Sequence, residues 1–368
     1  MIDTSDYATL FLADAPMIDT RAPVEFEKGS FPTAVNLPLM TDEERAEVGT
    51  CYKQQGQNAA IELGHRLVAG EIKQQRVDAW INFTRRNPQG YLFCFRGGLR
   101  SQICQQWLSD AGCDYPRVNG GYKAMRRFLI DTLEAESEQR PIVLLTGHTG
   151  SAKTALLEDI PNSLDLEGMA NHRGSAFGNR PAGQPPQISF ENILAIGMLK
   201  QAHYYPQQAT VLEDESRLIG KRYLPPALVE SMEKAPVVML DVTLQERVEH
   251  TFENYILDAL NERQQFHGEQ EGFEAFREYL ANSLFKIRRR LGGARYEELE
   301  KILQSALEDH ARGNPEGHRQ WIEILLRDYY DPMYAYQIRQ KQNRVIFSGD
   351  RDSVKQFLAE GEYLEKMA

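Results

Sequence analysis

Short apolar runs alternate with helical periodicity in the first third of the chain, a pattern typical of α/β domains. The candidate strands are residues 16–19, 34–37 and 90–94. Between 62 and 85 apolar residues recur at helical spacing, and turn residues after position 94 lead into a second predicted helix at 101–111. This pattern predicts an α/β domain over residues 1–130.

A second α/β pattern follows a polar, acidic segment at 131–140, which suits the end of a helix and a linker. The apolar run at 141–145 has no alternation, as expected of a central strand in a parallel sheet. Further candidate strands are residues 209–212, 236–240 and 344–347. Residues 244–340 are helical and charged in pattern. We therefore expect a second domain at 141–368, with a helical appendage before its last strand and a closing helix near 353–359.

The composition is that of a globular protein, since 42% of the 368 residues are hydrophobic and 26% are charged, which excludes disorder and collagen-like structure. No stretch approaches the roughly eighteen uninterrupted apolar residues that span a bilayer, and Asp3, Asp6 and Asp14 stand where a signal peptide would be basic. We expect a cytoplasmic protein without a membrane partner. With 53 acidic against 42 basic residues, the net charge of -11 argues against a broad basic surface for nucleic acid.

The first candidate for chemistry is a cysteine loop, CFRGGLRS, at 94–101. It follows a predicted strand and precedes a predicted helix, where backbone N–H groups bind anions and favour a thiolate. Gly97 and Gly98 let the backbone curl, and either Arg96 or Arg100 can neutralise a bound anion. We therefore predict that Cys94 is reactive rather than a buried structural thiol.

The other three cysteines form no CxxC metal pair. Cys104 and Cys113 lie within and just after the predicted helix, where small core residues are expected. Cys51 is expected in a polar loop and is a weaker candidate for a resolving thiol.

The segments IDTRAPVEF at 18–26 and GSFPTAVNLPL at 29–39 resemble the N-terminal motif of rhodanese domains. Ser30 and Thr33 replace the His and Gly usual in that motif. The resemblance implies a rhodanese-like fold for the first domain.

The cysteine loop departs from the common rhodanese pattern, because Arg100 lies six residues after Cys94 rather than five. This is the Cys-x5-Arg spacing of cysteine-dependent phosphatases, and the wider loop fits a ligand of phosphate size. Sulfur transfer, phosphate-ester hydrolysis and chemistry on a phosphorylated chalcogen donor all stay open. The phosphatase alternative is weakened because Phe93 stands where tyrosine phosphatases have His.

The second candidate site is GHTGSAKT at 147–154, which has the Walker A layout of a P-loop directly after a predicted strand. Its diphosphate-binding candidates are Gly147, Gly150, Ser151, Lys153 and Thr154. Lys153 is expected to hold phosphate oxygens, and Thr154 could reach a magnesium ion. Ala152 replaces a usual glycine, so we expect either a negative φ at this residue or a phosphate bound slightly farther from the loop. The substitution argues against ordinary nucleotide hydrolysis.

Two polar segments can complete this second site. Glu213 and Glu215 follow a predicted strand and could organise a metal ion or an attacking group, or could form a solvated acidic turn. The glycine-rich segment NHRGSAFG at 171–178 is a candidate substrate loop, in which His172, Arg173 and Ser175 are the candidate contacts.

A rhodanese-like half joined to a P-loop half, with LEGMANHRGS at 166–175 and FCFRGGLRS at 93–101, closely resembles the bacterial tRNA 2-selenouridine synthase family over essentially the whole chain. The resemblance implies a transferase in which selenium from selenophosphate replaces sulfur in 2-thiouridine at the tRNA wobble position. It also implies geranyl transfer from geranyl diphosphate to that sulfur, which gives an intermediate that selenium then displaces. Cys94 would carry selenium as S-selanylcysteine, and the P-loop would hold the diphosphate.

The implied partners are the tRNA and the enzyme that supplies selenophosphate, and no tightly bound cofactor is implied. Basic residues gather between 277 and 295, where Arg288, Arg289 and Arg290 are candidates for tRNA contact. Tyr329, Tyr330, Tyr334 and Tyr336 could stack on unpaired bases. A solvated helix face and aromatic core packing explain the same residues equally well. The alternative function is a rhodanese-type sulfurtransferase or Cys-x5-Arg phosphatase coupled to a nucleotide-binding P-loop domain.

Overall fold

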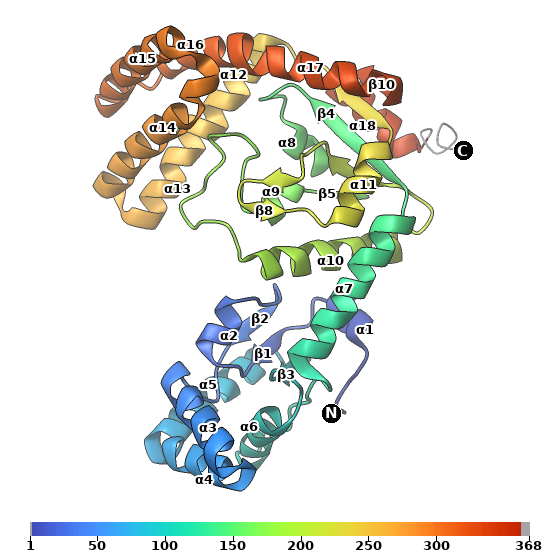
Figure 1. Cartoon of the computed structure of the whole chain (residues 1–368), viewed down its shortest axis with the longest axis vertical. Helices are drawn as coiled ribbons and strands as arrows, with labels where there is room; N and C mark the ends of the chain where they lie inside the picture. The colour runs from blue at the N-terminus through green and yellow to red at the C-terminus, as the bar shows by residue number, and fades with distance from the viewer. Residues whose placement is uncertain (1, 362–368) are drawn as a thin grey trace. The chain divides into compact units, whose positions relative to one another are not determined.

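Two compact units form the chain, and the computed structural model describes residues 2–361 (Figure 1). The first unit contains the residues up to Glu136 together with Pro186–Lys200. The second contains Ser137–Pro185 and the residues from Gln201 onward. Each unit joins a parallel sheet to helices, which confirms the α/β fold class.

The first boundary between the units, at Glu136 and Ser137, lies inside the segment 131–140 that was expected to be a linker. Helix α7 (Gly121–Gln139) runs through nearly all of that segment. Residues 186–200, expected in the second domain, belong to the first unit. One reason is that the Asn192 side chain donates a hydrogen bond to the carbonyl oxygen of Ser30 at 2.8 Å.

Three short parallel strands form the sheet of the first unit, in the order β2-β1-β3. The strands are β1 (Met17–Asp19), β2 (Ala34–Asn36) and β3 (Tyr91–Phe93). The helices are α1 (Tyr7–Leu12), α2 (Pro23–Glu27), α3 (Asp42–Gln55), α4 (Gln57–Leu67), α5 (Gly70–Arg86) and α6 (Leu99–Asp110). The three candidate strands are confirmed, whereas the helix predicted at 62–85 is interrupted at Val68 and Ala69. Trp80 and Leu108 are among the most deeply buried residues of the core.

Cys51 lies within helix α3, so its predicted position in a polar loop is wrong. Thr41 begins this helix with a capping box, in which its hydroxyl accepts from the Glu44 amide and the Glu44 carboxylate accepts from the Thr41 amide. No residue of α3 is buried, which explains why its sequence has the polar character of a loop.

The second unit contains a five-stranded parallel sheet in the order β10-β9-β4-β6-β5. Its strands are β4 (Ile142–Gly147), β5 (Ser163–Leu164), β6 (Thr210–Glu213), β9 (Val237–Leu240) and β10 (Val345–Gly349), beside a small hairpin of β7 (Leu218–Ile219) and β8 (Arg222–Tyr223). Strand β4 is central and buried throughout, as its unbroken apolar run predicts. The later candidate strands are confirmed as β6, β9 and β10. The helices outside the appendage are α8 (Lys153–Leu157), α9 (Leu166–Met169), α11 (Pro226–Lys234) and α18 (Arg351–Glu360), whereas most of α10 (Gln187–Tyr204) belongs to the first unit.

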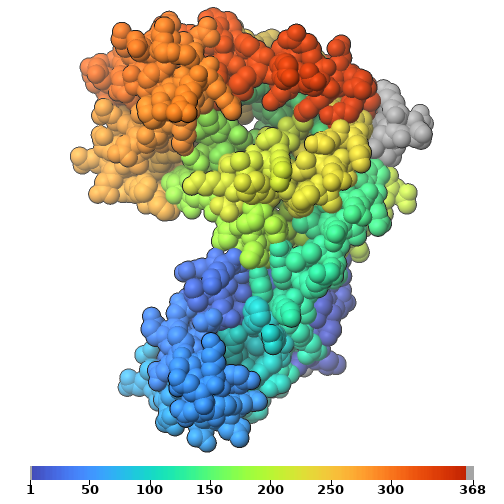
Figure 2. All heavy atoms as spheres, viewed as in Figure 1, coloured from blue at the N-terminus to red at the C-terminus, as the bar shows by residue number. Residues whose placement is uncertain are grey.

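Residues 244–340 form the expected helical appendage. Its elements are α12 (Leu244–Phe252), η1 (Glu253–Leu257), α13 (Asp258–His267), α14 (Glu269–Leu291), α15 (Gly293–Ala311), α16 (His318–Leu325), η2 (Leu326–Tyr330) and α17 (Asp331–Lys341), followed by the short turn η3 (Gln342–Arg344). Phe276, Leu299 and Trp321 belong to an apolar core separate from that of the sheet. The orange surface of α14 and α15 forms an outer face of the second unit (Figure 2). No helix in the described part of the chain is long and apolar enough to cross a membrane.

Candidate active sites

The P-loop connects the central strand β4 to helix α8. Lys153 begins α8, and its Nζ atom donates to the carbonyl oxygen of Gly147 at 3.2 Å. Thr154 Oγ1 donates to Oε1 of Glu213 at 2.8 Å, so the loop is tied to the end of the neighbouring strand β6. The buried hydroxyl of Ser151 has no hydrogen-bond partner among the described residues. Because an unpaired buried hydroxyl is costly, the loop is suited to a ligand that supplies a polar atom there.

Ala152 has a left-handed backbone, with φ 59° and ψ 35°, so the expectation of a negative φ is wrong. Gly150 also has a positive φ, of 83°. The chain must pass from strand to helix within five residues, and these two left-handed positions accomplish the turn. This conformation costs an alanine about 1 kcal/mol relative to glycine.

A pocket of about 440 Å³ opens over the P-loop. The predicted residues that line it are Gly150, Ser151, Lys153, Thr154, His172, Arg173, Ser175 and Glu215. Gly147 and Glu213 are not in the lining, and each acts through its hydrogen bond to a P-loop side chain. The structure therefore brings the P-loop, the acidic strand end and the candidate substrate loop to one site.

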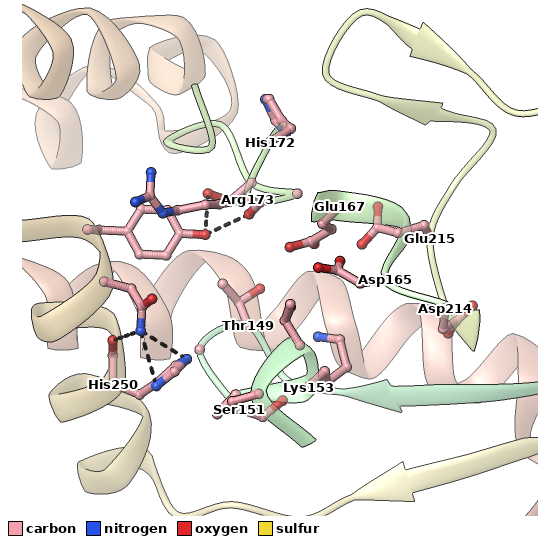
Figure 3. Close-up of a pocket in the computed structure, with 18 of the residues that line it drawn as sticks. Thr149, Ser151, Lys153, Asp165, Glu167, His172, Arg173, Asp214, Glu215 and His250 are labelled. Atoms are coloured by element: carbon pink, nitrogen blue, oxygen red, sulfur yellow. Dashed lines mark hydrogen bonds between the residues drawn. The ribbon is translucent and has the colours of Figure 1, made fainter. Parts of the chain in front are cut away.

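A cluster of buried and partly buried carboxyl groups lies beside the P-loop. Asp165 and Glu167, which sequence reasoning missed, come from the start of α9 and lie near Glu215, with Lys153 below them (Figure 3). Burial and the nearby Asp165 charge raise the pKa of Glu213 to about 7. Burial, together with the charges of Glu213 and Glu215, raises the pKa of Glu167 well above its usual range. At neutral pH this crowded group therefore holds protons that isolated carboxylates would have lost.

The substrate loop places a cation against the same pocket. Arg173 is 9% exposed, and its Nη2 atom donates to Oε1 of Glu262 at 2.7 Å. Its Nη1 atom is buried without a hydrogen-bond partner among the described residues, so it can donate to a ligand. The Tyr255 hydroxyl donates to the Arg173 carbonyl oxygen at 2.7 Å and fixes the loop. Burial lowers the pKa of His172 and so favours the neutral form of this pocket histidine.

The helical appendage supplies the apolar part of the lining. Tyr255, Tyr330, Met333 and Tyr334 all belong to this part. Tyr330 and Tyr334, expected to stack on tRNA bases, therefore line the P-loop pocket, whereas Tyr336 is exposed. No local pattern marks Tyr330 and Tyr334 as neighbours of the P-loop, because they follow it by more than 170 positions.

An ion-pair network ties the appendage to the P-loop backbone. The buried Arg247 donates to both carboxylate oxygens of Asp331, at 2.7 and 2.8 Å, and to the carbonyl oxygen of Thr149 at 3.3 Å. His148 Nδ1 lies 3.0 Å from the same Asp331 carboxylate. The network joins α12, the start of α17 and two P-loop residues, so it positions the loop against the aromatic wall.

Cys94 lies directly after β3 in the first unit, as predicted, and is 3% exposed. Its Sγ atom donates to Oγ of Ser101 at 3.3 Å. The Cys94 carbonyl oxygen accepts from the Tyr122 amide at 2.9 Å, and Gly97 packs directly against the backbone of Gly120 and Gly121. Backbone contacts therefore fix the path of the cysteine loop.

The two arginines of the cysteine loop differ in their surroundings. Arg100 pairs with Glu25, at 2.6 Å between Nη1 and Oε2, and Arg45 lies 3.2 Å from the same carboxylate. Burial alone would lower the pKa of Arg100, but the Glu25 carboxylate outweighs it and raises that pKa. Arg96 is exposed, so it is the more accessible cation for a ligand. Both arginines and Cys94 line a second pocket, of about 870 Å³.

The basic candidates at the end of α14 do not form a uniform stripe. Arg288 donates to the Phe285 carbonyl oxygen at 2.9 Å, and its guanidinium lies 3.5 Å from the centre of the Phe285 ring. Arg289 and Arg290 are exposed. The described residues include no group of three or more His, Cys, Asp or Glu side chains placed to hold a metal ion.

A Walker A loop after the central strand of a parallel sheet, with its threonine bonded to an acid on the next strand, defines the second unit as a P-loop domain. A family model described as the tRNA 2-selenouridine synthase AAA domain matches residues 140–364. The tRNA 2-selenouridine synthases of Hahella chejuensis and Pseudomonas syringae pv. syringae are 57% and 54% identical to the chain, each over 97% of it, and the matches cover 94% and 98% of those proteins. That of Marinobacter nauticus is 51% identical over 96% of the chain and 97% of its own length. The chain belongs to the tRNA 2-selenouridine synthase family.

Proposed function

We propose that this chain converts 2-thiouridine at the wobble position of tRNA into 2-selenouridine in two reactions, one in each unit. The observation that carries the proposal is near-complete coverage by relatives named tRNA 2-selenouridine synthase, in a chain with one anion-binding loop per unit. We further propose that the first unit has the rhodanese fold. Its parallel β2-β1-β3 order, with Cys94 directly after β3, supports this assignment.

The first proposed reaction takes place at the P-loop. The thiouridine sulfur attacks the first carbon of geranyl diphosphate, a C–S bond forms, and diphosphate leaves. Lys153, Arg173 and the P-loop N–H groups stabilise the departing charge, while Tyr330 and Met333 offer apolar contact to the hydrocarbon chain. Magnesium in phosphate sites takes one or two protein oxygens plus phosphate oxygens, and Thr154 and Glu213 would hold it here.

The second proposed reaction takes place beside Cys94. Its net chemistry consumes S-geranyl-2-thiouridine, selenophosphate and water, and it produces 2-selenouridine, geranylthiol and phosphate. Geranylation turns the sulfur into a thiol leaving group, so selenium can replace it at C2. The Cys94 thiolate attacks the phosphorus of selenophosphate, the P–Se bond breaks, and the released hydrogen selenide displaces geranylthiol at C2. Water then hydrolyses the phosphorylated Cys94 to phosphate, and Arg96 offers a cation to the phosphate of the donor.

The test supplies wild-type protein with thiolated tRNA, geranyl diphosphate and selenophosphate, followed by mass spectrometry of the nucleosides. We expect Cys94→Ala to lower selenation by about 100-fold or more, as for the loss of a nucleophile, and to leave geranylation intact. Lys153→Ala should show the reverse: little geranylation, with normal selenation of tRNA that is already geranylated. Cys113→Ala is the matched thiol control and should retain both activities.

Absence of both modified nucleosides with the wild-type protein would contradict the proposed function. Sulfur transfer to a thiol acceptor, or phosphatase activity lost in Cys94→Ala, would then support the alternative enzyme. Loss of both tRNA reactions in a folded Cys94→Ala protein would contradict the division of labour between the units.

A further inference from the structure

The pocket beside Cys94 is larger and more apolar than an anion site requires. Selenophosphate has five heavy atoms, whereas the pocket measures about 870 Å³, near the upper end of the range for small-molecule sites. The volume beyond the cysteine loop therefore suits a second, larger chemical group.

The apolar part of the lining comes mainly from helices α3, α4 and α6, together with residues 39 and 40 before α3 and Val68 after α4. Its members are Leu39, Met40, Val48, Ala60, Ile61, Val68, Ile103 and Trp107. Leu39, Val68 and Trp107 are buried, so they form a preformed wall rather than loose surface side chains. Val48, Ile61 and Ile103 are partly exposed on α3, α4 and α6 and face the pocket.

Cations also line the pocket. Arg96 and Lys53 are exposed, and Arg45 is 40% exposed while it pairs with Glu25. Arg100 lies deeper, beside the same Glu25. An apolar wall combined with basic residues is complementary to a ligand that is a hydrocarbon at one end and polyanionic at the other.

We propose that this pocket binds the geranyl chain of S-geranyl-2-thiouridine tRNA during the selenium reaction, with RNA phosphates against Arg96 and Lys53. This proposal rests on the proposed function and adds a second prenyl-recognition site, distinct from the P-loop pocket. The chain packs against Ile61, Val48 and Trp107, which places the C–S bond beside the Cys94 loop. The pocket thereby selects geranylated over unmodified tRNA for the second reaction.

The test compares two anticodon stem-loop RNAs, one with S-geranyl-2-thiouridine and one with S-methyl-2-thiouridine. Both release an alkyl thiol, so a difference between them reports recognition of the chain rather than leaving-group chemistry. We expect the wild-type protein to bind the geranyl RNA about tenfold or more tightly in fluorescence anisotropy, since burial of a few CH₂ groups is worth that factor. Selenation with selenophosphate should show the same preference in kcat/KM.

Two pocket variants and one matched control make the test specific. Ile61→Glu places a charge in the pocket, and Ile61→Trp fills it. Both should lower affinity for the geranyl RNA about tenfold or more while leaving the methyl RNA and the geranylation reaction unchanged. Ile72→Glu makes the same chemical change on an exposed residue of α5, 44% exposed and outside the pocket, and should change nothing. Thermal unfolding establishes that each variant is folded.

Equal binding of the two RNAs by the wild-type protein would overturn the proposal, and so would variants that weaken both RNAs equally. If the wild-type protein prefers the geranyl RNA but makes no selenouridine, the pocket stands and the proposed function fails. If selenouridine forms equally well from both RNAs without a binding preference, the proposed function stands and the pocket assignment fails.

Discussion

The carboxyl groups around the P-loop show how burial changes the chemistry of single residues. Burial raises the pKa of Glu167 most, and the nearby charges of Glu213 and Glu215 raise it further. In the unfolded chain its pKa returns to about the ordinary value of 4.5. Folding therefore binds a proton at this site when the pH lies between the unfolded and the folded pKa.

This linkage fixes the sign of a pH effect on stability. A raised carboxyl pKa gives stability that is fully present below the unfolded value near 4.5 and is lost as the pH rises through the folded value. Glu167→Gln mimics the protonated form and has no proton to lose. We expect its advantage in unfolding free energy over wild type to grow between pH 5 and pH 8, because folding of the wild-type protein must take up a proton that the unfolded carboxyl has lost.

Denaturant titrations at the two pH values measure this difference. The exposed Glu308→Gln serves as control and should follow wild type at both. An advantage that stays constant or shrinks with rising pH would show that Glu167 is ionised in the folded protein.

At the scale of elements, the junction between the P-loop and helix α8 carries local strain. Ala152, at the N-cap of α8, has a left-handed backbone that glycine adopts without cost. We expect Ala152→Gly to stabilise the protein by up to about 1 kcal/mol. Ala155→Gly, inside the same helix, should destabilise it by roughly 1 kcal/mol. Urea unfolding of both variants gives the comparison, and a loss of stability in both would contradict the strained conformation of Ala152.

The elements that the sequence predicts correctly are those with strong local signals. Three of these signals depend on neighbouring residues alone: the apolar run of β4, the Walker A spacing, and the charged helical pattern of residues 244–340. The two-residue strand β5 has no such signal, because it forms only by pairing with β6. The polar segment at 131–140 was expected to be the end of a helix and a linker, and helix α7 continues through it to Gln139.

Site residues are likewise predictable where a local motif marks them. Lys153, Glu215 and Arg173 line the same pocket, as their motifs predict. Asp165 and Glu167 were missed because the pairing of β5 with β6 brings the following helix to the P-loop. The left-handed φ of Ala152 was missed because local propensity favours a negative value, and the anchored ends of the loop override it.

At the scale of the whole molecule, the net charge of -11 means that the proposed tRNA substrate requires local basic surfaces for its binding. Arg289 and Arg290 are exposed at the end of α14, and the Lys286 charge acts on His172, which lines the P-loop pocket. We therefore expect any RNA that enters the pocket to contact this end of α14.

Each phosphate contact contributes roughly 0.7 to 0.9 to the slope of log affinity against log salt concentration. We expect Arg289→Ala and Arg290→Ala each to reduce that slope by about this amount for thiolated tRNA. Arg312→Ala, also exposed in the appendage, should leave the slope unchanged. Binding measured at several salt concentrations provides the comparison, and slopes equal to wild type in both variants would exclude these residues from the RNA surface.

The close contact of Gly97 with Gly120 and Gly121, near Cys94, limits which residues can replace these glycines during evolution. A Cβ atom at Gly97 would lie 2.7 Å from the amide nitrogen of Gly120, and one at Gly121 would lie 2.2 Å from the carbonyl oxygen of Cys94. Both obstacles are backbone atoms, which no substitution elsewhere can remove. Mutations elsewhere therefore cannot make room for a side chain at either position. We expect related sequences that keep the cysteine loop to keep both Gly97 and Gly121.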